Sequence, residues 1–313
     1  MDRLIRSLHH VTATVSDAQE DLDFYIGLLG MRLVKKTVNF DNHNVFHFYY
    51  GNEHGVPGTI MTTFPYKGWG VPAGTKGAGQ ITVTSFSVPG GSLGFWRARL
   101  QASGLAVGEG ARFGDERLLC DDPSGLMIEL IANDRDRRVP WVTDDIGADN
   151  AVRGVHGVTL AIRDPVKTLE LMTDVLGFEV VDEADGCTRL AVGGDEPGKT
   201  IDVLHAPEAP AAVNGLGTVH HVAMAISDAD EQLRMRDELI RLGRQVTEVR
   251  DRQYFKSIYF REPGGVLFEI ATAGPGFTVD EELPCLGHDL KLPPWEEPHR
   301  AEIERGLPPV VHG

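Results

Sequence analysis

Two short segments of this 313-residue chain place paired histidines in nearly the same sequence context. LHHVT contains His10 and VHHVA contains His221, each as the second histidine of its pair. Glu269 lies in VLFEIA, an apolar run in which a carboxylate is costly unless it is paired or bound to a metal. Two histidines and one carboxylate can occupy one face of an octahedral metal and leave the other face open to substrate and O2. This ligand set is typical of non-haem Fe(II) oxygenases, and Mn(II) can also occupy it.

The segments around these histidines belong to a repeat. Three stretches begin alike, each with an alternating strand that ends at a helix-capping aspartate: LHHVTATVSDA, VHGVTLAIRDP and VHHVAMAISDA. The capping residues are Asp17, Asp164 and Asp228. Each stretch continues into an amphipathic helix, which we expect to end at a glycine in the left-handed conformation. These glycines are Gly30, Gly177 and Gly243.

A weaker fourth copy begins at Gln80, so the chain is predicted to contain four βαβββ modules and to have an α+β fold. The modules cover residues 7–65, 80–133, 154–206 and 217–272. A polar stretch that ends at Asn150 lacks periodicity and is typical of a linker. We therefore expect two barrel-like domains, over 1–145 and 151–273, followed by a C-terminal tail, 274–313. The tail is expected to wrap over the C-terminal half, with Trp295 as an anchor.

Alignment of the four modules exposes two sets of equivalent positions. The opening slot, in the first strand of each module, holds His10, Val83, Gly157 and His221. The closing slot, in the last strand of each module, holds Thr62, Glu129, Asp202 and Glu269. Only modules 1 and 4 together supply two histidines and one glutamate, so the ligand set predicts that these modules close one barrel. A lone histidine at the start of a strand is more often structural, but two in equivalent slots favour a ligand role.

Composition excludes several classes of function. Lys and Arg total 30 against 46 Asp and Glu, a net charge of −16, which argues against binding nucleic acid or an anionic membrane. No apolar run approaches the roughly 20 residues that span a bilayer, and we see no signal peptide. The three cysteines are far apart and odd in number, so we expect neither a disulfide framework nor a cysteine-based zinc site. A cytoplasmic location is therefore expected.

Longer motifs carry a resemblance to a known family. The repeats with these slots resemble the vicinal oxygen chelate superfamily, which includes glyoxalase I and extradiol dioxygenases. YGNEHGVPGTIMTTFP, DRQYFKSIYFREPGGVLFE and the tail GFTVDEE…LGHDLK are similar to hydroquinone ring-cleaving dioxygenases such as 2,6-dichlorohydroquinone 1,2-dioxygenase. The resemblance covers nearly the whole chain. It implies two vicinal-oxygen-chelate domains and the metal ligands His10, His221 and Glu269, in agreement with the slots.

The resemblance also implies roles for residues around the metal. Substrate-binding roles fall to His9 and Thr12, and catalytic roles to His220, Arg252 and Tyr259. Thr12 is two residues from His10 and shares its face of the strand. His9 and His220 should face away in a regular strand unless a bulge re-aims them, and each could instead be a core histidine. Arg252 could be a surface arginine in the charged run VRDR, and Tyr259 could merely pack.

Other histidines are weaker candidates. In ordinary two-domain extradiol enzymes the first ligand comes from the third module, but that slot here is Gly157. His156 is one residue early, which places it on the opposite face of an extended strand. His43 and His47 are four residues apart, but the β-prone FHFYY argues against a shared helical face. The glycine-rich GVPAGTKGAGQ lacks the end of a phosphate-binding loop, so no nucleotide cofactor is expected.

These observations predict an Fe(II)-dependent dioxygenase that opens a substituted hydroquinone ring with O2. Three alternatives remain open at this point. A catechol extradiol dioxygenase would use the same ligands, and a glyoxalase-type isomerase or lyase would use a redox-inert metal. A metal-free small-molecule binding protein would leave the placement of His10 and His221 unexplained. The expected partners are a small aromatic diol and O2, and a homo-oligomer is compatible with the sequence.

Overall fold

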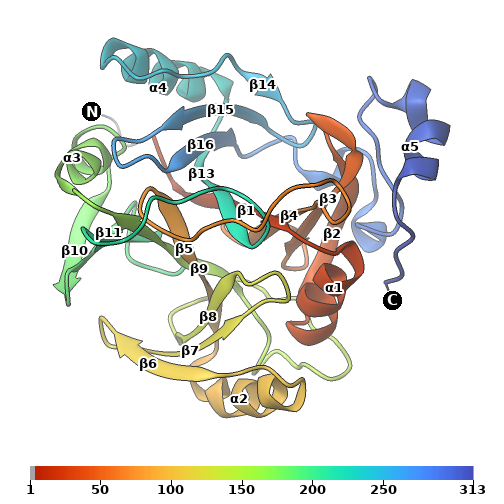
Figure 1. The fold of residues 1–313 in the computed structure, drawn as a ribbon, viewed down its shortest axis with the longest axis horizontal. Coiled ribbons are helices and arrows are strands. Elements are labelled where there is room, and N and C mark those ends of the chain that lie inside the picture. Colours follow the sequence, from red (N-terminus) through yellow and green to blue (C-terminus); the bar gives the residue numbers. More distant parts are fainter. Residues whose placement is uncertain (1–3, 313) are drawn as a thin grey trace.

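The computed structural model describes residues 4–312, and the strands in this part of the chain form two eight-stranded sheets. The metal-ligand candidates lie in the first sheet, whose strand order is β14-β15-β16-β13-β1-β4-β3-β2. Its strands are β1 (Ser7–Val15), β2 (Arg32–Asn39), β3 (Asn42–Gly51), β4 (Ile60–Pro65), β13 (Thr218–Ile226), β14 (Arg250–Asp251), β15 (Lys256–Arg261) and β16 (Leu267–Thr272). Modules 1 and 4 therefore share this sheet, as the ligand set predicts (Figure 1).

The second sheet is built from modules 2 and 3 in the order β10-β11-β12-β9-β5-β8-β7-β6. Its strands are β5 (Gln80–Val88), β6 (Gly108–Arg112), β7 (Asp115–Asp121), β8 (Met127–Ala132), β9 (Gly154–Ile162), β10 (Glu179–Ala184), β11 (Cys187–Ala191) and β12 (Thr200–His205). Each half of the chain, 1–145 and 151–273, thus gives one module to each sheet. The division at the linker describes the order of the repeats and not the composition of the sheets.

The two sheets are related by the same strand pairing. In the first, β1 pairs antiparallel with β13, and each of these strands pairs in parallel with the closing strand of its own module, β4 or β16. In the second, β5 and β9 pair antiparallel at the centre, with β8 and β12 as their parallel neighbours. The closing-slot residues occupy equivalent register positions, since Glu269 pairs with Ala223 and Asp202 pairs with Thr159.

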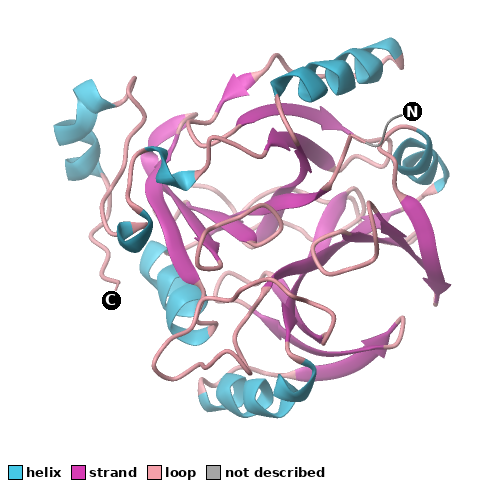
Figure 2. Cartoon of the chain, turned by 180° about the vertical axis from the view of Figure 1, so that it is seen from behind, coloured by secondary structure: helices cyan, strands magenta, loops and turns pink. Residues whose placement is uncertain are grey.

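The helices lie on the outside of the two sheets (Figure 2). They are α1 (Ala18–Leu22) with its π-helical continuation (Asp23–Leu28), α2 (Leu93–Ala102), α3 (Val166–Asp174), α4 (Ala229–Arg241) and α5 (Arg300–Gly306). Short 3₁₀ turns occur at Gly90–Ser92, Phe277–Val279, Leu283–Cys285 and Glu297–His299. No helix within residues 4–312 combines the length and apolarity needed to cross a membrane.

The helix ends follow most of the predicted signals. The Asp17 side chain accepts hydrogen bonds from the backbone of Gln19 and Glu20, and the Asp228 side chain accepts one from Glu231. Gly30, Gly177 and Gly243 all have positive φ, near +64°, +77° and +76°. Asp164 is one residue too early to be the N-cap, because α3 begins after Pro165.

The C-terminal tail packs mainly on module 1, whereas we expected it to cover the C-terminal half, which it contacts where Phe277 and Asp280 meet Tyr254 of module 4. Figure 1 places α5 beside β3, and Ile303 of α5 joins Val38 and Leu292 in a small apolar cluster. The Trp295 ring packs edge-on against Phe40, with ring centroids 5.6 Å apart. Trp295 anchors the tail as expected, but it does so on the β2–β3 hairpin, and 45% of the residue remains exposed.

An edge strand and a buried lysine explain this location of the tail. β2 ends the first sheet, so its outer backbone groups are free to pair, and Leu290 forms a bridge to Lys36 of this strand. The neighbouring Lys35 side chain is fully buried and donates hydrogen bonds to Asp280, at 2.6 Å, and to Glu281. A buried ammonium needs such partners, and the tail supplies them.

Candidate metal centre

Two β-bulges shape the centre of the first sheet. The register of the β1–β13 ladder shifts between Leu8 and His10 and again between His221 and Val219, so His9 and His220 are the extra residues. In a regular strand the rings of His9 and His220 would point to the face opposite His10 and His221. Each bulge instead turns its ring toward the neighbouring histidine. As a result, His9 Nδ1 lies 2.8 Å from His10 Nδ1, and His220 Nδ1 lies 2.7 Å from His221 Nδ1.

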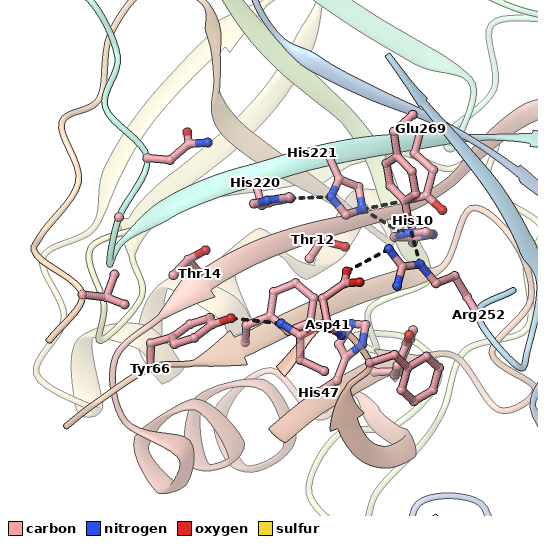
Figure 3. A pocket seen from close by; sticks show the side chains of 18 of the residues that line it. His10, Thr12, Thr14, Asp41, His47, Tyr66, His220, His221, Arg252 and Glu269 are labelled. Carbon is pink, nitrogen blue, oxygen red and sulfur yellow. Dashed lines mark hydrogen bonds and ion pairs between the residues drawn. The ribbon is translucent and has the colours of Figure 1, made fainter. Parts of the chain in front are cut away.

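The bulges leave the Nε2 atoms of His10 and His221 facing each other at 3.2 Å. Oε2 of Glu269 lies 2.8 Å from His221 Nε2 and 3.4 Å from His10 Nε2. All three side chains are buried, and their ligand atoms lie within 4.8 Å of one another (Figure 3). Among the described residues, this is the one cluster of three such side chains that could hold a metal ion.

Glu269 is held in its ionised form although its side chain is fully buried. Burial would raise the pKa of this fully buried carboxyl, but His10 and His221 hold its pKa well below the usual range. Oε1 accepts a hydrogen bond from Ser257, whereas Oε2 has no well-aligned hydrogen-bond donor among the described groups. A buried anionic oxygen without a donor, beside two imidazole nitrogens, fits a divalent cation.

Arg252 and Tyr259 border the same site. Tyr259 pairs across the ladder with Glu269, and its ring centroid lies 5.7 Å from that of His221. Arg252 Nε donates to Tyr259 Oη at 3.1 Å, and its Nη2 donates to Asp41 at 3.0 Å. Burial raises the pKa of Tyr259, so the phenol stays protonated near neutral pH and can donate a hydrogen bond.

A chain of contacts links three polar side chains, of which Thr12 and His47 line the cavity of the site. Thr12 Oγ1 lies 2.8 Å from Thr62 Oγ1, which lies 2.9 Å from His47 Nε2. His47 was set aside in the sequence because its spacing from His43 is helical. The alternation of FHFYY on a strand was the usable signal, since it puts His47 on the same face as Tyr49. Asp41, in the β2–β3 turn, carried no sequence signal.

The three candidate ligands line a cavity of about 440 Å³. The cavity is also lined by Thr12, His47, His220, Arg252 and Tyr259. His9 does not line it. Instead its ring packs against His10 and Phe255, and burial lowers its pKa to about 3. The structure thus brings every predicted site residue to one place, with His9 behind the candidate ligand His10 and not among the residues that line the cavity.

Comparison with known proteins identifies the fold family. A sequence model described as the Glyoxalase/Bleomycin resistance protein/Dioxygenase superfamily matches residues 7–130 and 154–270. The chain belongs to this superfamily. The resemblance stated from the sequence motifs is therefore confirmed, as is the α+β fold built from two glyoxalase-like sheets.

Relatives in the superfamily match the chain over nearly its full length. "Putative ring-cleaving dioxygenase MhqE" of Bacillus subtilis is 46% identical over 301 residues, which cover 96% of this chain and 98% of the relative. "Chlorohydroquinone/hydroquinone 1,2-dioxygenase" of Sphingobium indicum is 36% identical over 317 residues, with 98% of each chain covered.

Solved structures show the same likeness. A Bacillus subtilis crystal structure superposes with a TM-score of 0.95 at 42% identity, covering 99% of this chain and 98% of that one. Glyoxalase I from Zea mays, at 16% identity, superposes with a TM-score of 0.63 and covers 90% of this chain and 97% of its own. The second likeness is one of fold alone.

In the second sheet, the positions equivalent to His10 and His221 do not hold histidine. Its opening slots are Val83 and Gly157, and its two closing-slot carboxylates are bound by arginines. Arg117 donates to Glu129 at 2.9 Å, and Arg189 donates to Asp202 at 2.7 and 3.0 Å. Guanidinium groups there neutralise the carboxylates, so this position is a buried ion network and not a second metal centre.

His156 belongs to this second sheet and lies apart from the metal centre. It occupies the bulge of β9 that corresponds to the His220 bulge of β13. The His156 side chain is buried, burial lowers its pKa to about 3, and its Nε2 lies 4.0 Å from Asp115. It is not among the three clustered ligand candidates.

Proposed function

We propose that the protein is a dioxygenase that opens hydroquinone rings with O2, using Fe(II) held by His10, His221 and Glu269. The single observation that carries the proposal is the convergence of two imidazole Nε2 atoms and one carboxylate oxygen at the wall of a cavity large enough for one aromatic ring. Mn(II) would fit the same ligands. Relatives named as ring-cleaving dioxygenases, including one named for hydroquinones, support the reaction class.

The bound metal would supply electron transfer between the aromatic ring and O2, which no side chain can perform. The reaction would break the bond between a hydroxylated ring carbon and its unhydroxylated neighbour, and both oxygen atoms would enter the product. The protein would bind the diol, exclude water and place protons. Phe255 and Tyr49 supply apolar cavity walls, and the Phe255 ring lies 5.2 Å from that of His10.

Residues beside the ligands would handle the protons. Tyr259 Oη is held by Arg252 Nε and is positioned to donate its proton or a hydrogen bond into the cavity. His220 uses Nδ1 to contact His221, which leaves its Nε2 as the ring nitrogen available to the cavity. The hydroxyl of Thr12 lines the same wall and would contact the bound diol. His9 would fix the ring orientation of His10 from behind.

The decisive experiment is O2 uptake by protein loaded anaerobically with Fe(II). The substrates are hydroquinone, methyl- and chlorohydroquinone, catechol and the hemithioacetal of methylglyoxal and glutathione. His10→Ala should abolish uptake, whereas the matched variant His156→Ala, in the second sheet, should retain it.

Each alternative function predicts a different result. Uptake with catechol alone would assign the protein to the extradiol enzymes. Turnover of the hemithioacetal without O2 would assign it to the glyoxalase-type isomerases. Absence of uptake with every diol, despite bound iron, would refute ring cleavage.

A further inference from the structure

His47 is a fixed polar group in the wall of the cavity. It lies on β3, and its Nε2 contacts Thr62 Oγ1 at 2.9 Å. Its ring is held between Tyr49 and Phe64, with centroid distances of 4.1 and 4.3 Å. Two aromatic neighbours and one hydrogen bond define both the position and the rotation of the imidazole, so its remaining nitrogen has a fixed direction.

That remaining nitrogen, Nδ1, is available to a ligand. Within residues 4–312 no group hydrogen-bonds it, yet it is not among the polar atoms that are sealed from solvent without a partner. His47 lines the cavity that contains the three candidate metal ligands. Nδ1 is therefore the ring nitrogen that this cavity-lining side chain has free for a ligand.

The internal symmetry of the first sheet places His47 across from the carboxylate ligand. Thr62 pairs with Tyr49 as Glu269 pairs with Tyr259, so Thr62 is the module 1 counterpart of Glu269. Two residues before each tyrosine lie His47 and Ser257, which contact Thr62 and Glu269 respectively. His47 thus occupies the wall opposite Glu269, with the opening slots between them.

This placement distinguishes between isomers of a diol. The two hydroxyls of a 1,4-diol point in opposite directions from the ring, whereas those of a 1,2-diol lie side by side. A diol that meets the metal through one hydroxyl would direct a 1,4-hydroxyl toward the opposite wall. Burial also lowers the pKa of His47 well below its usual value, so the neutral ring offers Nδ1 as a donor or an acceptor, and a hydroxyl can serve either.

We propose that His47 Nδ1 hydrogen-bonds the substrate hydroxyl farther from the metal and thereby favours 1,4-diols. This inference rests on the proposed function, because it assumes that a diol occupies the metal centre. Tyr66 is a rival for the same hydroxyl, since it lines the cavity and its Oη accepts a hydrogen bond from Asn39 at 2.9 Å.

The test compares ligands that differ in one hydroxyl. Calorimetric dissociation constants for hydroquinone and phenol are measured anaerobically on Fe(II)-loaded protein, without turnover. The wild type should prefer hydroquinone by about tenfold, the contribution of one hydrogen bond to a polar group. His47→Phe should reduce this preference to about twofold or less, and His47→Asn, which keeps a polar group near Nδ1, should restore part of it. Tyr66→Phe should leave the preference unchanged.

Several outcomes would overturn the inference. Equal weakening of hydroquinone and phenol by His47→Phe would indicate a structural role, as would an unchanged preference. Loss of the preference in Tyr66→Phe and its retention in His47→Phe would assign the hydroxyl to Tyr66. Failure of the proposed function is seen separately, as absence of O2 uptake by the wild type with hydroquinone, whatever the binding ratio.

Discussion

The Nε2 atoms of His10 and His221 lie 3.2 Å apart, although 211 positions separate the two residues in the chain. The contact exists because β1 and β13 form the centre of one sheet and because each strand carries a bulge beside its histidine. Both nitrogens also lie within 3.4 Å of Oε2 of Glu269. The candidate ligand set is therefore a product of the pairing between the first and last modules.

Removal of one of these ligands should abolish tight metal binding. His221→Ala leaves two ligands and should lower the affinity for Fe(II) by at least about 100-fold, because even partners of ligands matter by 10–100-fold. The measurement is metal content after anaerobic loading and desalting. His156→Ala should retain the wild-type content, and an equal loss in both variants would contradict the assignment.

His9 should influence the metal without touching the cavity. His9→Phe removes the Nδ1 contact to His10 and should weaken Fe(II) binding about 10–100-fold with little change in fold. Competition with a chromophoric chelator gives the affinity. The control is His43→Phe, which alters a histidine that contacts Glu296 of the tail. Unchanged affinity in His9→Phe would mean that His9 is only a core residue.

Arg252 and Arg250 provide a matched pair of cations. Both contact Asp41, but Arg252 alone also donates to Tyr259. Arg252→Ala should lower kcat about 100-fold, the usual effect of losing a preorganised donor at a reacting site. Arg250→Ala should stay within about twofold, since exposed ion pairs contribute little. Steady-state O2 uptake measures both, and similar losses would show that only the Asp41 contact matters.

Lys35 should be a major stabilising contact between β2 and the tail. Lys35→Met leaves the buried Glu281 carboxylate without its partner and should destabilise the fold by about 3–5 kcal/mol. Lys36→Met changes a half-buried neighbour whose partner is His312, and should cost about 0.5 kcal/mol. Urea unfolding of both variants gives these values. Equal effects would mean that burial of Lys35 carries no special weight.

Asp21 should make stability depend on pH. Burial raises the pKa of this carboxyl from 3.8 to about 7, although Tyr50 and Thr63 donate hydrogen bonds to it. The nearby carboxyls of Asp122 and Asp17 raise it further. The unfolded state therefore releases this proton near pH 4, whereas the folded state keeps it until about pH 7. Stability falls as the pH rises through this window.

The check is urea unfolding of metal-free protein at pH 5 and pH 7.5. The wild type should lose about 2–3 kcal/mol from this one group, because the interval contains about two pH units over which only the folded state keeps the proton, at about 1.4 kcal/mol per unit. Asp21→Asn cannot ionise, so its loss over the same interval should be smaller by most of that amount. A parallel decline in both proteins would assign the pH dependence to other groups.

The sequence predicts the first sheet and its ligand set because both follow from repetition. Equivalent slots in four modules can be compared with one another, and only modules 1 and 4 combine two histidines with one glutamate. The bulges at His9 and His220 could not be predicted, because no local residue type requires them. The sequence indicated only that these two rings would reach the site if bulges were present. Once present, they re-aim both rings toward the ligands.

Features formed by contacts between distant elements were not predictable. His47 becomes a candidate site residue only because β4 brings Thr62 beside it. Asp41 becomes one only because the β2–β3 turn contacts Arg252. The location of the tail was predicted only in part, because composition alone does not indicate which edge strand is available. The attraction of Asp280 and Glu281 to Lys35 depends on the burial of that lysine, which follows from the whole sheet.

The nesting of modules 2 and 3 between modules 1 and 4 sets an order of assembly during translation. The inner pair is contiguous in the chain and can complete its own sheet as soon as β12 leaves the ribosome. Strand β1 is made first, yet it must wait for β13, and the metal centre must wait for Glu269. Throughout that interval the edge of β1 lacks its antiparallel partner, and an unpaired strand edge is open to incorrect pairing.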